Sequence, residues 1–550
     1  MDRSLRLLPP VLLPVLLSAL LVGLWWWPNR PRAGDVPMPE AKFESVSFAP
    51  YRAWQSPLAG IFPTRAEVNQ DMALVARRAR GIRTYSALEG KYDPGALAKA
   101  HGLKLWQGIW LGSSPKQNAA EMAAGIAIAN AHPRTVDRVV VGNEVLLRRD
   151  LPVNALIADI EHVKRHVKQP VTYADVWEFW EQFPQVARHV DIVTVHILPY
   201  WENHPTSVSG AIAHIRNILA RMHRLFPGKK IAIGEAGWPS RGRWRQNAVP
   251  SRVNEAVFIR RFIALAKAEH IDYNLIEAFD QVWKYHSEGT VGANWGLWTA
   301  ARQPKFPLTG PVVEHPRWRW YAAGGVIASL LLFAGTLAAN PRLPPRARAR
   351  LAVLAFALGG ALSFAWAFTV PVIYDRYLWI CALGNLPGQA LLAALLMRRA
   401  AAILSGRPLP AARTGADATR TVQALLRLRL PALRDSLFED LGFLFVWAAG
   451  VMQLLLVFDP RYRDFPLPVF AVPLVAVVAR ALLADIPRGG GWEEWVAGGA
   501  LALGAIASAV QEGPLNHQSL IWNAAALLIA APVLWRVLPI RARLALLFRW

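Results

Sequence analysis

Hydrophobic residues follow two different patterns along this chain. Between about residues 46 and 312, short runs rich in β-branched residues alternate with amphipathic stretches of helix length. In residues 5–27, and repeatedly after residue 318, the apolar stretches are instead near the length that crosses a bilayer. The pattern therefore predicts a soluble α/β domain flanked by membrane-spanning segments.

Eight short runs in the first region are typical of buried parallel strands, with room for one helix between successive strands. A doubly wound sheet is the competing fold, but no glycine-rich phosphate loop follows the first run. Eight βα units in one domain favour a closed (β/α)₈ TIM barrel. The runs are Ser45–Pro50, Gly81–Tyr85, Leu103–Trp110, Arg138–Glu144, Val171–Asp175, Ile192–His196, Ile231–Glu235 and Asn274–Phe279.

The N-terminal apolar stretch ends in the three tryptophans 25–27 and lacks a small-residue cleavage site. It therefore favours a retained signal anchor over a cleaved signal peptide. Seven more apolar segments follow the barrel, so we expect eight spans and both termini on one side. These segments lie near 320–339, 351–370, 377–397, 440–458, 466–484, 491–510 and 518–537.

Arginine positions test this count. The spacers 341–350 and 398–437 and the C-terminal tail are rich in arginine, whereas the alternate spacers carry few or balanced charges. By the positive-inside rule the arginine-rich spacers are cytoplasmic. We therefore expect a multi-pass protein of a bacterial inner membrane, with both termini cytoplasmic and the barrel in the periplasm. The expected domains are 1–27 anchor, 28–45 linker, 46–312 catalytic barrel and 313–550 polytopic membrane domain.

Composition supports a membrane protein. Hydrophobic residues make up 54% of the chain and the mean hydropathy is +0.23. The net charge of +23 does not indicate a nucleic-acid partner, because the arginines lie in spacers and no binding module accompanies them. The single cysteine, Cys381, excludes an intrachain disulfide framework and a thiolate-rich metal site.

Two of the strand-like runs end on a glutamate. Glu144 closes Arg138–Glu144 after Asn143, and Glu235 closes Ile231–Glu235 before Ala-Gly-Trp-Pro-Ser. About three βα units separate them, so we expect them on the fourth and seventh strands, nearly opposite each other at the barrel mouth. Two such carboxylates are the minimum apparatus for cleaving a glycosidic bond with retention. We expect burial to raise the pKa of Glu144, as an acid/base residue requires.

Each residue of this constellation has a plainer interpretation. Taken alone, Asn143-Glu144 is a weak signal, and Glu144 pairing with Arg148 or Arg149 would be purely structural. The string around Glu235 is more specific, because small neighbours leave space for a sugar ring and Trp238 offers a stacking face. No metal and no organic cofactor is implied, since the carboxylate mechanism needs none.

These residues resemble glycoside hydrolase family 17, the β-1,3-glucanases and β-1,3-glucan transglycosylases, and look closest to its fungal and bacterial branches. The resemblance covers residues 46–305 and implies the TIM barrel and the retaining mechanism, with Glu144 as acid/base and Glu235 as nucleophile. The strings that carry it are Ile82–Ser86, Gly102–Trp110, Val141–Val145, Val171–Trp177, Ile231–Ser240 and Glu277–Lys284.

The resemblance also implies substrate-binding residues. The aromatic rings would either line the sugar site or pack within the barrel in the ordinary way. Lys284 would either contact the sugar or form a surface ion pair. Two positions depart from the family pattern: Gln281 replaces a usual glutamate, and His196 replaces a common asparagine. His196 is interpreted as a sugar ligand or, with slight preference, as a hydrogen-bonded interior residue. The implied substrate contacts are Tyr51, Tyr85, Asn143, Asp175, Trp177, Tyr200, Trp238, Trp283, Lys284, Glu288 and Trp298.

Three functions follow. The leading hypothesis is a membrane-bound retaining β-1,3-glucan transglycosylase, a glucosyltransferase that elongates or branches a periplasmic glucan, because a hydrolase alone gains little from eight spans. An anchored endo-β-1,3-glucanase is the enzymatic alternative. A non-catalytic glucan-export or synthase-partner scaffold is the alternative of another class. The expected partners are a β-glucan and the lipid bilayer, and any glucan synthase would be a separate chain, since no inner loop is large enough to bind a nucleotide sugar.

Overall fold

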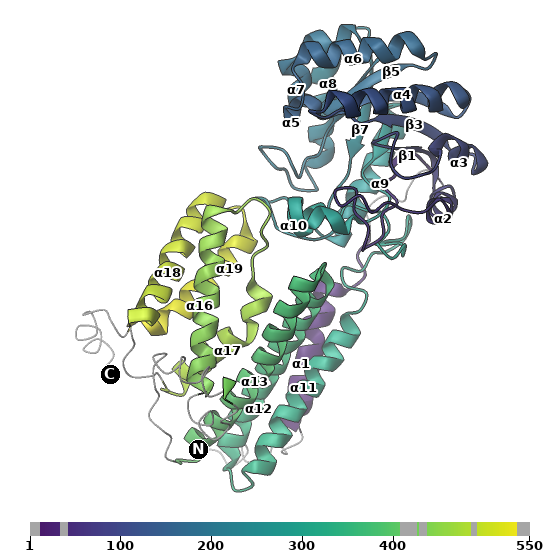
Figure 1. Ribbon diagram of the computed structural model, residues 1–550. Coiled ribbons are helices and arrows are strands. Elements are labelled where there is room, and N and C mark those ends of the chain that lie inside the picture. The colour runs from purple at the N-terminus through teal and green to yellow at the C-terminus, as the bar shows by residue number, and fades with distance from the viewer. Residues whose placement is uncertain (1–11, 34–41, 408–425, 428–436, 486–491, 536–550) are drawn as a thin grey trace. The chain divides into compact units, whose positions relative to one another are not determined.

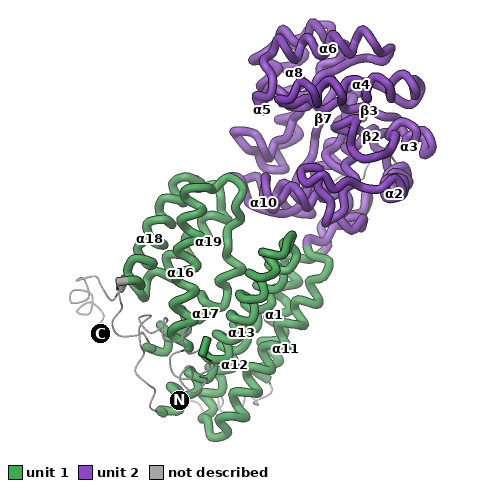
Figure 2. Tube along the Cα trace, in the orientation of Figure 1, with its two compact units in different colours: residues 1–30, 315–550 green, residues 31–314 purple. Residues whose placement is uncertain are grey.

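The structure is a computed structural model and describes residues 12–33, 42–407, 426–427, 437–485 and 492–535. The chain forms two compact units. One consists of residues 31–314, and the other combines residues 1–30 with 315–550 (Figure 2). Most of the arginine-rich 398–437 loop and the arginines of the C-terminal tail lie outside the described residues.

The unit of residues 31–314 is a (β/α)₈ barrel, which confirms the predicted fold. Eight parallel strands hydrogen-bond in chain order and the last pairs with the first, so the sheet is closed. Helices surround the strands (Figure 1). The strands are β1 Phe43–Ser47, β2 Ala79–Arg83, β3 Lys104–Ile109, β4 Val136–Asn143, β5 Val171–Val176, β6 Ile192–His196, β7 Lys230–Ala236 and β8 Asp272–Leu275.

Helices cover the barrel between its strands. Their starts are capped as the sequence demands: Thr64 and Glu67 form a reciprocal capping box at α2, and Ser251 accepts from the backbone of Asn254 at α9. The helices are α2 Arg65–Val75, α3 Pro94–Ala100, α4 Pro115–Ala131, α5 Val145–Arg148, α6 Val153–His166, α7 Trp177–Gln182, η2 Pro184–Arg188, α8 Ala211–Leu225, α9 Arg252–Ala268, η3 Val282–Lys284 and α10 Tyr285–Gly292.

The first and last strands differ most from the sequence prediction. β1 begins at Phe43, so the last residues of the predicted 28–45 linker belong to the barrel. The run predicted to continue to Phe279 leaves the sheet after Leu275. Beyond it, Ile276 N and Ala278 N still donate to Ala236 O and Ser47 O of the neighbouring strands. The alternate groups pair with the segment before Thr299, because Glu277 N donates to Trp295 O and Trp298 N donates to Ala278 O. Apolar character alone does not distinguish these two kinds of pairing.

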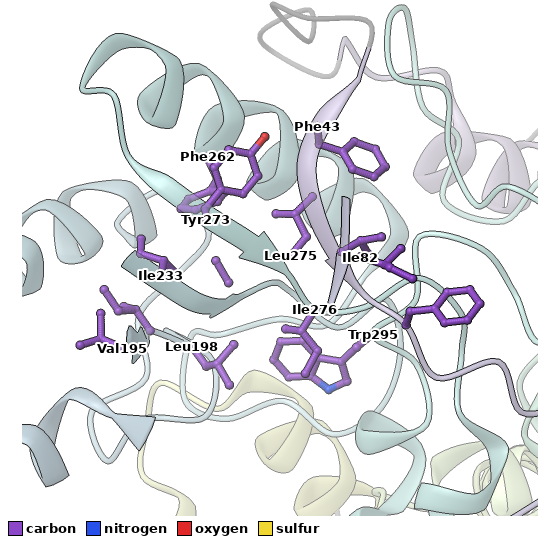
Figure 3. Packing of buried hydrophobic residues seen from close by; sticks show 14 of the residues in the cluster. Phe43, Ile82, Val195, Leu198, Ile233, Phe262, Tyr273, Leu275, Ile276 and Trp295 are labelled. Atoms are coloured by element: carbon purple, nitrogen blue, oxygen red, sulfur yellow. The ribbon is translucent and has the colours of Figure 1, made fainter. Parts of the chain in front are cut away.

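Strand alternation separates an apolar core from a polar barrel interior. Outward residues pack under the helices, as Tyr273 of β8 does edge-on against Phe262 of α9, with ring centroids 5.2 Å apart (Figure 3). Inward positions are polar and hydrogen-bonded: Asn274 accepts from Ser45 and donates to Ser47. This satisfied polar layer gives the strand ends a rigid base on which to hold charged side chains.

The second unit is helical. Among its described residues and α1, six helices are long and apolar enough to cross a membrane. The side chains bind across helices, since Trp25 Nε1 of α1 donates to Ser363 Oγ of α12 at 3.1 Å. The helices are α1 Leu12–Asn29, α11 Trp318–Ala339, α12 Pro345–Thr369, η4 Val370–Val372, α13 Arg376–Leu404, α16 Leu437–Phe458, η6 Leu467–Phe470, α17 Ala471–Leu482, α18 Trp492–Glu512 and α19 His517–Trp535.

The expected eight spans correspond to these six candidates plus two other helices. The predicted 466–484 span is a 3₁₀ turn followed by the short α17, because prolines 466 and 468 delay the α-helix. Gln389 of α13 closes this break: its side-chain oxygen accepts from Val472 N at 3.0 Å, and its amide donates to Pro468 O at 3.2 Å. The predicted 491–510 span is α18, which opens with Glu493 and Glu494.

Candidate active site

The two glutamates meet at the carboxyl ends of the strands. Glu144 directly follows β4 and Glu235 is the penultimate residue of β7. An oxygen of each carboxylate and a ring nitrogen of His196, the last residue of β6, all lie within 4.8 Å of one another. The Glu235 side chain is only 6% exposed, whereas the Glu144 side chain is 23% exposed. One carboxylate is therefore sequestered and its partner faces the solvent from which a substrate arrives.

Local backbone conformation aims Glu144. Its φ of 53° lies in the left-handed region, which is uncommon for a residue with a Cβ atom, and Gly142 just before it has a φ of 83°. The Glu144 amide still donates to Ala174 O of β5 at 2.8 Å, so the strand connection is kept while the chain turns. Such a conformation at a strand end marks a position where geometry is favoured over ease of folding.

Arg83, the last residue of β2, lies among the acidic groups. It is 1% exposed, and its Nη1 lies 3.2 Å from Glu235 Oε1 and 2.8 Å from Gly234 O. Nη2 donates to the side-chain oxygen of Asn143. A buried guanidinium so placed neutralises one carboxylate and orients the amide beside the other.

His196 bridges the two glutamates. Its Nδ1 lies 2.9 Å from Glu144 Oε1, and its Nε2 lies 3.7 Å from Glu235 Oε1. The Glu144, His196 and Glu235 cluster has donor types that also suit a metal ion. Arg83, however, places a positive charge 3.3 Å from Nε2 and 3.2 Å from Glu235, which disfavours a second cation there.

Tyr85 completes the surroundings of Glu235. Its hydroxyl lies 2.9 Å from Glu235 Oε1 and 2.9 Å from Ser47 Oγ. A close contact between strands fixes this residue, because a Cβ at Gly108 would lie 2.2 Å from Thr84 O. Only glycine permits that approach, and the segment leading into Tyr85 is thereby set against β3.

Residues 45–296 match the family model of the BtgE/BtgC glycoside hydrolase domain. A glucan 1,3-beta-glucosidase of Candida albicans is 26% identical over 266 residues, which cover 43% of this chain and 84% of that relative. The barrel is similar to glycoside hydrolase family 17. A glucan 1,3-beta-glucosidase of Saccharomyces cerevisiae is 25% identical, over 39% of this chain and 75% of its own length. A family 17 β-1,3-glucanosyltransferase structure from Rhizomucor miehei shares 24% identity at a TM-score of 0.43, over 49% of this chain and 98% of that one.

The pKa of Glu144 is not raised, contrary to the expectation from its sequence. Burial alone would raise it, but the hydrogen bond from His196 and the positive charges of Arg148 and Arg83 outweigh burial, so the pKa lies below its usual value. The neighbouring Asp175 behaves oppositely, because burial raises its pKa to about 6 and the Glu144 charge adds to the rise. Asp175 also accepts from Tyr173 and from Val176 N, so it supports the backbone beneath Glu144.

A third buried carboxylate lies beside the pair. Glu277, just beyond β8, is fully buried, and Lys284 Nζ lies 3.0 and 3.1 Å from its two oxygens. Burial raises the pKa of Glu277 to about 7, against the opposing charge of Lys284. Lys284 thus forms a buried ion pair with Glu277 rather than an ion pair at the surface. The Glu288 carboxyl lies within electrostatic range of Lys284, Glu144 and Glu235, and burial raises its pKa.

The structure separates the aromatic residues of this glycoside hydrolase domain into two groups. Trp177 and Trp283 keep partial exposure. The hydroxyl of Tyr51, packed edge-on 6.2 Å from Trp283, and the Trp177 indole nitrogen both lack a hydrogen-bond partner within the described chain. Both are buried donors without a partner among the described residues, so their role as sugar contacts stays a prediction.

The second group is core. Trp238 is fully buried and its indole nitrogen donates to Val249 O at 2.9 Å, so the expected stacking face is not available and that prediction is wrong. Tyr200 is equally buried against Trp238 and donates to Arg243 O. Trp298 is 5% exposed and packs on Phe43 and Phe279. These three rings stabilise the barrel by packing rather than by contacting sugar.

Sequence reasoning missed Arg83 and Glu277 as site residues and gave His196 no part in the carboxylate pair. Arg83 and Glu277 belong to the family-like strings Ile82–Ser86 and Glu277–Lys284, and His196 ends the strand run Ile192–His196. An arginine within a β-branched strand run is itself a signal, because a buried charge needs a partner. Gln281 is also explained: it is buried and its amide donates to Ala49 O at 2.7 Å and Phe279 O at 2.9 Å, so it braces the loop after β8.

Proposed function

We propose that this chain is a membrane-bound retaining β-1,3-glucan transglycosylase. The observation that carries the proposal is the pair of carboxylates, whose nearest oxygens lie within 4.8 Å of each other. Retaining glycosidases place their carboxyl groups about 5–5.5 Å apart, whereas inverting enzymes need about 6.5–9.5 Å to admit a water. The β-1,3-glucan substrate is supported by relatives named as glucan 1,3-beta-glucosidases.

In the first half-reaction Glu235 is the nucleophile. One of its oxygens attacks the anomeric carbon while the bond from that carbon to the glycosidic oxygen breaks. Glu144 in its protonated form gives its proton to the departing oxygen, and a glycosyl ester of Glu235 forms. Arg83 and Tyr85 contact Oε1 of Glu235, which leaves Oε2 for the attack.

The second half-reaction decides between transfer and hydrolysis. Glu144 now takes a proton from an acceptor hydroxyl, whose oxygen attacks the anomeric carbon and releases Glu235. A sugar acceptor yields a longer or branched glucan, and water yields a shorter one. We favour transfer because the described part of the chain also holds six helices of membrane-spanning length and composition, which suits a nascent polymer better than a diffusible one.

The same reasoning suggests a location. The arginine-rich spacers are cytoplasmic by the positive-inside rule, so the barrel faces the periplasm of a bacterial inner membrane. A glucan arriving from a separate synthase would emerge on that side. An anchored endo-β-1,3-glucanase is the second candidate, supported by the hydrolase names of the curated relatives. A non-catalytic scaffold is disfavoured by the paired carboxylates, which binding alone does not require.

The test uses the full chain in detergent with reducing-end-labelled β-1,3-gluco-oligosaccharides. Labelled products longer than the starting sugar establish transfer, and their linkages separate elongation from branching. Glu235→Gln should abolish both activities, whereas Glu44→Gln, a half-exposed glutamate paired with Arg80 at the far side of β1, should change neither. Shorter products alone would establish the hydrolase, and full activity of Glu235→Gln would refute the assignment.

A further inference from the structure

His196 is surrounded by charge yet is completely buried. It lies on β6, and each of its ring nitrogens faces a different partner. Nδ1 is 2.9 Å from Glu144 Oε1, and Nε2 is 3.3 Å from Arg83 Nη1 and 3.7 Å from Glu235 Oε1. A buried imidazole that touches both members of a carboxylate pair affects their charges directly.

Arg83 fixes the tautomer of this ring. A guanidinium carries only N–H donors and cannot accept a hydrogen bond. Because Nε2 faces Arg83 Nη1, Nε2 is the acceptor and carries no proton. Neutral His196 then bears its proton on Nδ1, which points at Glu144 Oε1.

We propose that His196 is a positioning residue for Glu144: locked in its Nδ1–H tautomer by Arg83, it donates to Glu144 and keeps that carboxylate ionised between turnovers. The inference rests on the proposed function, which makes Glu144 the acid/base. It assigns the buried histidine a role in the proton transfers of the reaction, beyond the packing of β6.

Other charged groups around His196 do not replace this hydrogen bond. Asp175 on β5 lies within electrostatic range but is itself engaged by Tyr173 and Val176 N. Arg148 lies within electrostatic range of Glu144, but its guanidinium binds Asp150 and the backbone oxygens of Asn143 and Leu111. Further carboxyl, hydroxyl and ammonium groups act on the pair from beyond the ring: Tyr85, Glu277, Lys284 and Glu288.

The hydrogen bond from His196 to Glu144 affects the two half-reactions differently. An ionised Glu144 is ready to take the proton of an acceptor hydroxyl, as the second half-reaction requires. The first half-reaction needs a proton on Glu144, so substrate binding has to weaken the contact with His196. The histidine therefore favours release of the glycosyl-enzyme to an acceptor over its formation.

The test compares three substitutions at His196 in the full chain. Asparagine places an amide N–H near the position of Nδ1, glutamine places its amide near Nε2, and leucine keeps bulk without a donor. The alkaline limb of the pH profile of kcat/KM reports loss of the acid proton in the free enzyme. His196→Leu and His196→Gln should move that limb upward by about one pH unit, and His196→Asn should leave it near the wild-type position.

A purely structural role gives a different pattern. All three variants would then lower kcat without moving the alkaline limb of the pH profile, and that result overturns the inference. An unmoved alkaline limb in His196→Leu, in a protein that unfolds at the wild-type temperature, overturns it as well. An aryl β-glucoside with an activated leaving group gives a second measurement, because its cleavage needs no acid and should survive in His196→Leu. If the wild type turns over substrate and the alkaline limb is unmoved in His196→Leu, this inference alone is refuted. Absence of wild-type turnover defeats the proposed function as well.

Discussion

The hydroxyl of Tyr85 and the carboxylate of Glu235 lie 2.9 Å apart, and the hydroxyl meets the same oxygen that Arg83 contacts at 3.2 Å. Both donors fall on Oε1. Across the described chain no hydrogen bond reaches Oε2. The carboxylate is therefore held by one oxygen and has the other available for chemistry, and each donor is expected to matter for rate more than for folding.

Tyr85→Phe should lower kcat/KM by about 10- to 100-fold, because a hydrogen bond to a charged group contributes about 1.5–3 kcal/mol. Steady-state kinetics on β-1,3-gluco-oligosaccharides measures the loss. Tyr92→Phe is the matched control, since Tyr92 lies outside the carboxylate cluster and should retain wild-type kinetics. Equal losses in the two variants would contradict the role of the Tyr85 hydroxyl.

Trp238→Ala should destabilise the barrel by about 3–5 kcal/mol, since it empties a fully buried position. Trp177→Ala should destabilise the barrel less than Trp238→Ala does, because its ring is only partly buried against the core, and should raise KM about 2- to 10-fold if the predicted sugar contact is made. Chemical unfolding followed by fluorescence and kinetics on oligosaccharides measure the two effects. The reverse pattern would show that the two aromatic groups are wrongly divided.

Glu89→Gln should flatten the pH dependence of stability. Burial, with the nearby Glu121 charge, raises the pKa of Glu89 to about 8 from an ordinary value of 4.5. The folded state therefore holds the Glu89 proton more tightly than the unfolded chain does. The contribution of Glu89 to the free energy of unfolding is complete below pH 4.5 and is lost as the pH rises through 8. Unfolding at pH 5 and pH 8 measures the difference, which the variant should reduce by about 1–3 kcal/mol.

Part of that pH dependence should survive in Glu89→Gln. The pKa of Asp175 is raised to about 6 and that of Glu277 to about 7, both in the same direction. Glu44→Gln, an exposed control, should leave the whole dependence in place. An unchanged slope in Glu89→Gln would mean that this carboxyl is ionised in the folded barrel.

Membrane topology has a direct test, because Cys381 is the single cysteine of the chain. In a Cys381→Ser background, Lys116→Cys on the exposed surface of the barrel should react with a membrane-impermeant maleimide in cells with a permeabilised outer membrane. Ala411→Cys, in the predicted cytoplasmic loop, should react only after the inner membrane is opened. Labelling of Ala411→Cys alone in intact inner membranes would invert the proposed orientation.

The fold and the two glutamates were predictable because their signals are local. A β-branched run that ends on a glutamate predicts both a buried strand and a carboxylate at the carboxyl end of that strand. The arrangement around the pair was not predictable in this way. Arg83 and His196 come from β2 and β6, and only closure of the barrel brings them to Glu144 and Glu235.

The aromatic residues show the other limit. Trp238 and Trp177 each come shortly after a predicted strand run that ends in an acidic residue, Glu235 and Asp175, and nothing in their neighbours distinguishes a ring that faces sugar from one that packs inward. The expected rise in the pKa of Glu144 failed for a related reason. Burial is visible in a hydrophobic pattern, but a hydrogen bond from a residue on another strand is not.

The left-handed backbone of Glu144 implies that thermal stability and catalytic activity favour different residues at this position. A side chain at a φ of 53° costs free energy that glycine would not pay. Glu144→Gly should therefore produce a barrel that tolerates heat at least as well as the natural one while losing the acid/base. Selection for thermal endurance alone would erode this position, so an evolved or engineered line of the enzyme keeps Glu144 only while catalysis is also selected.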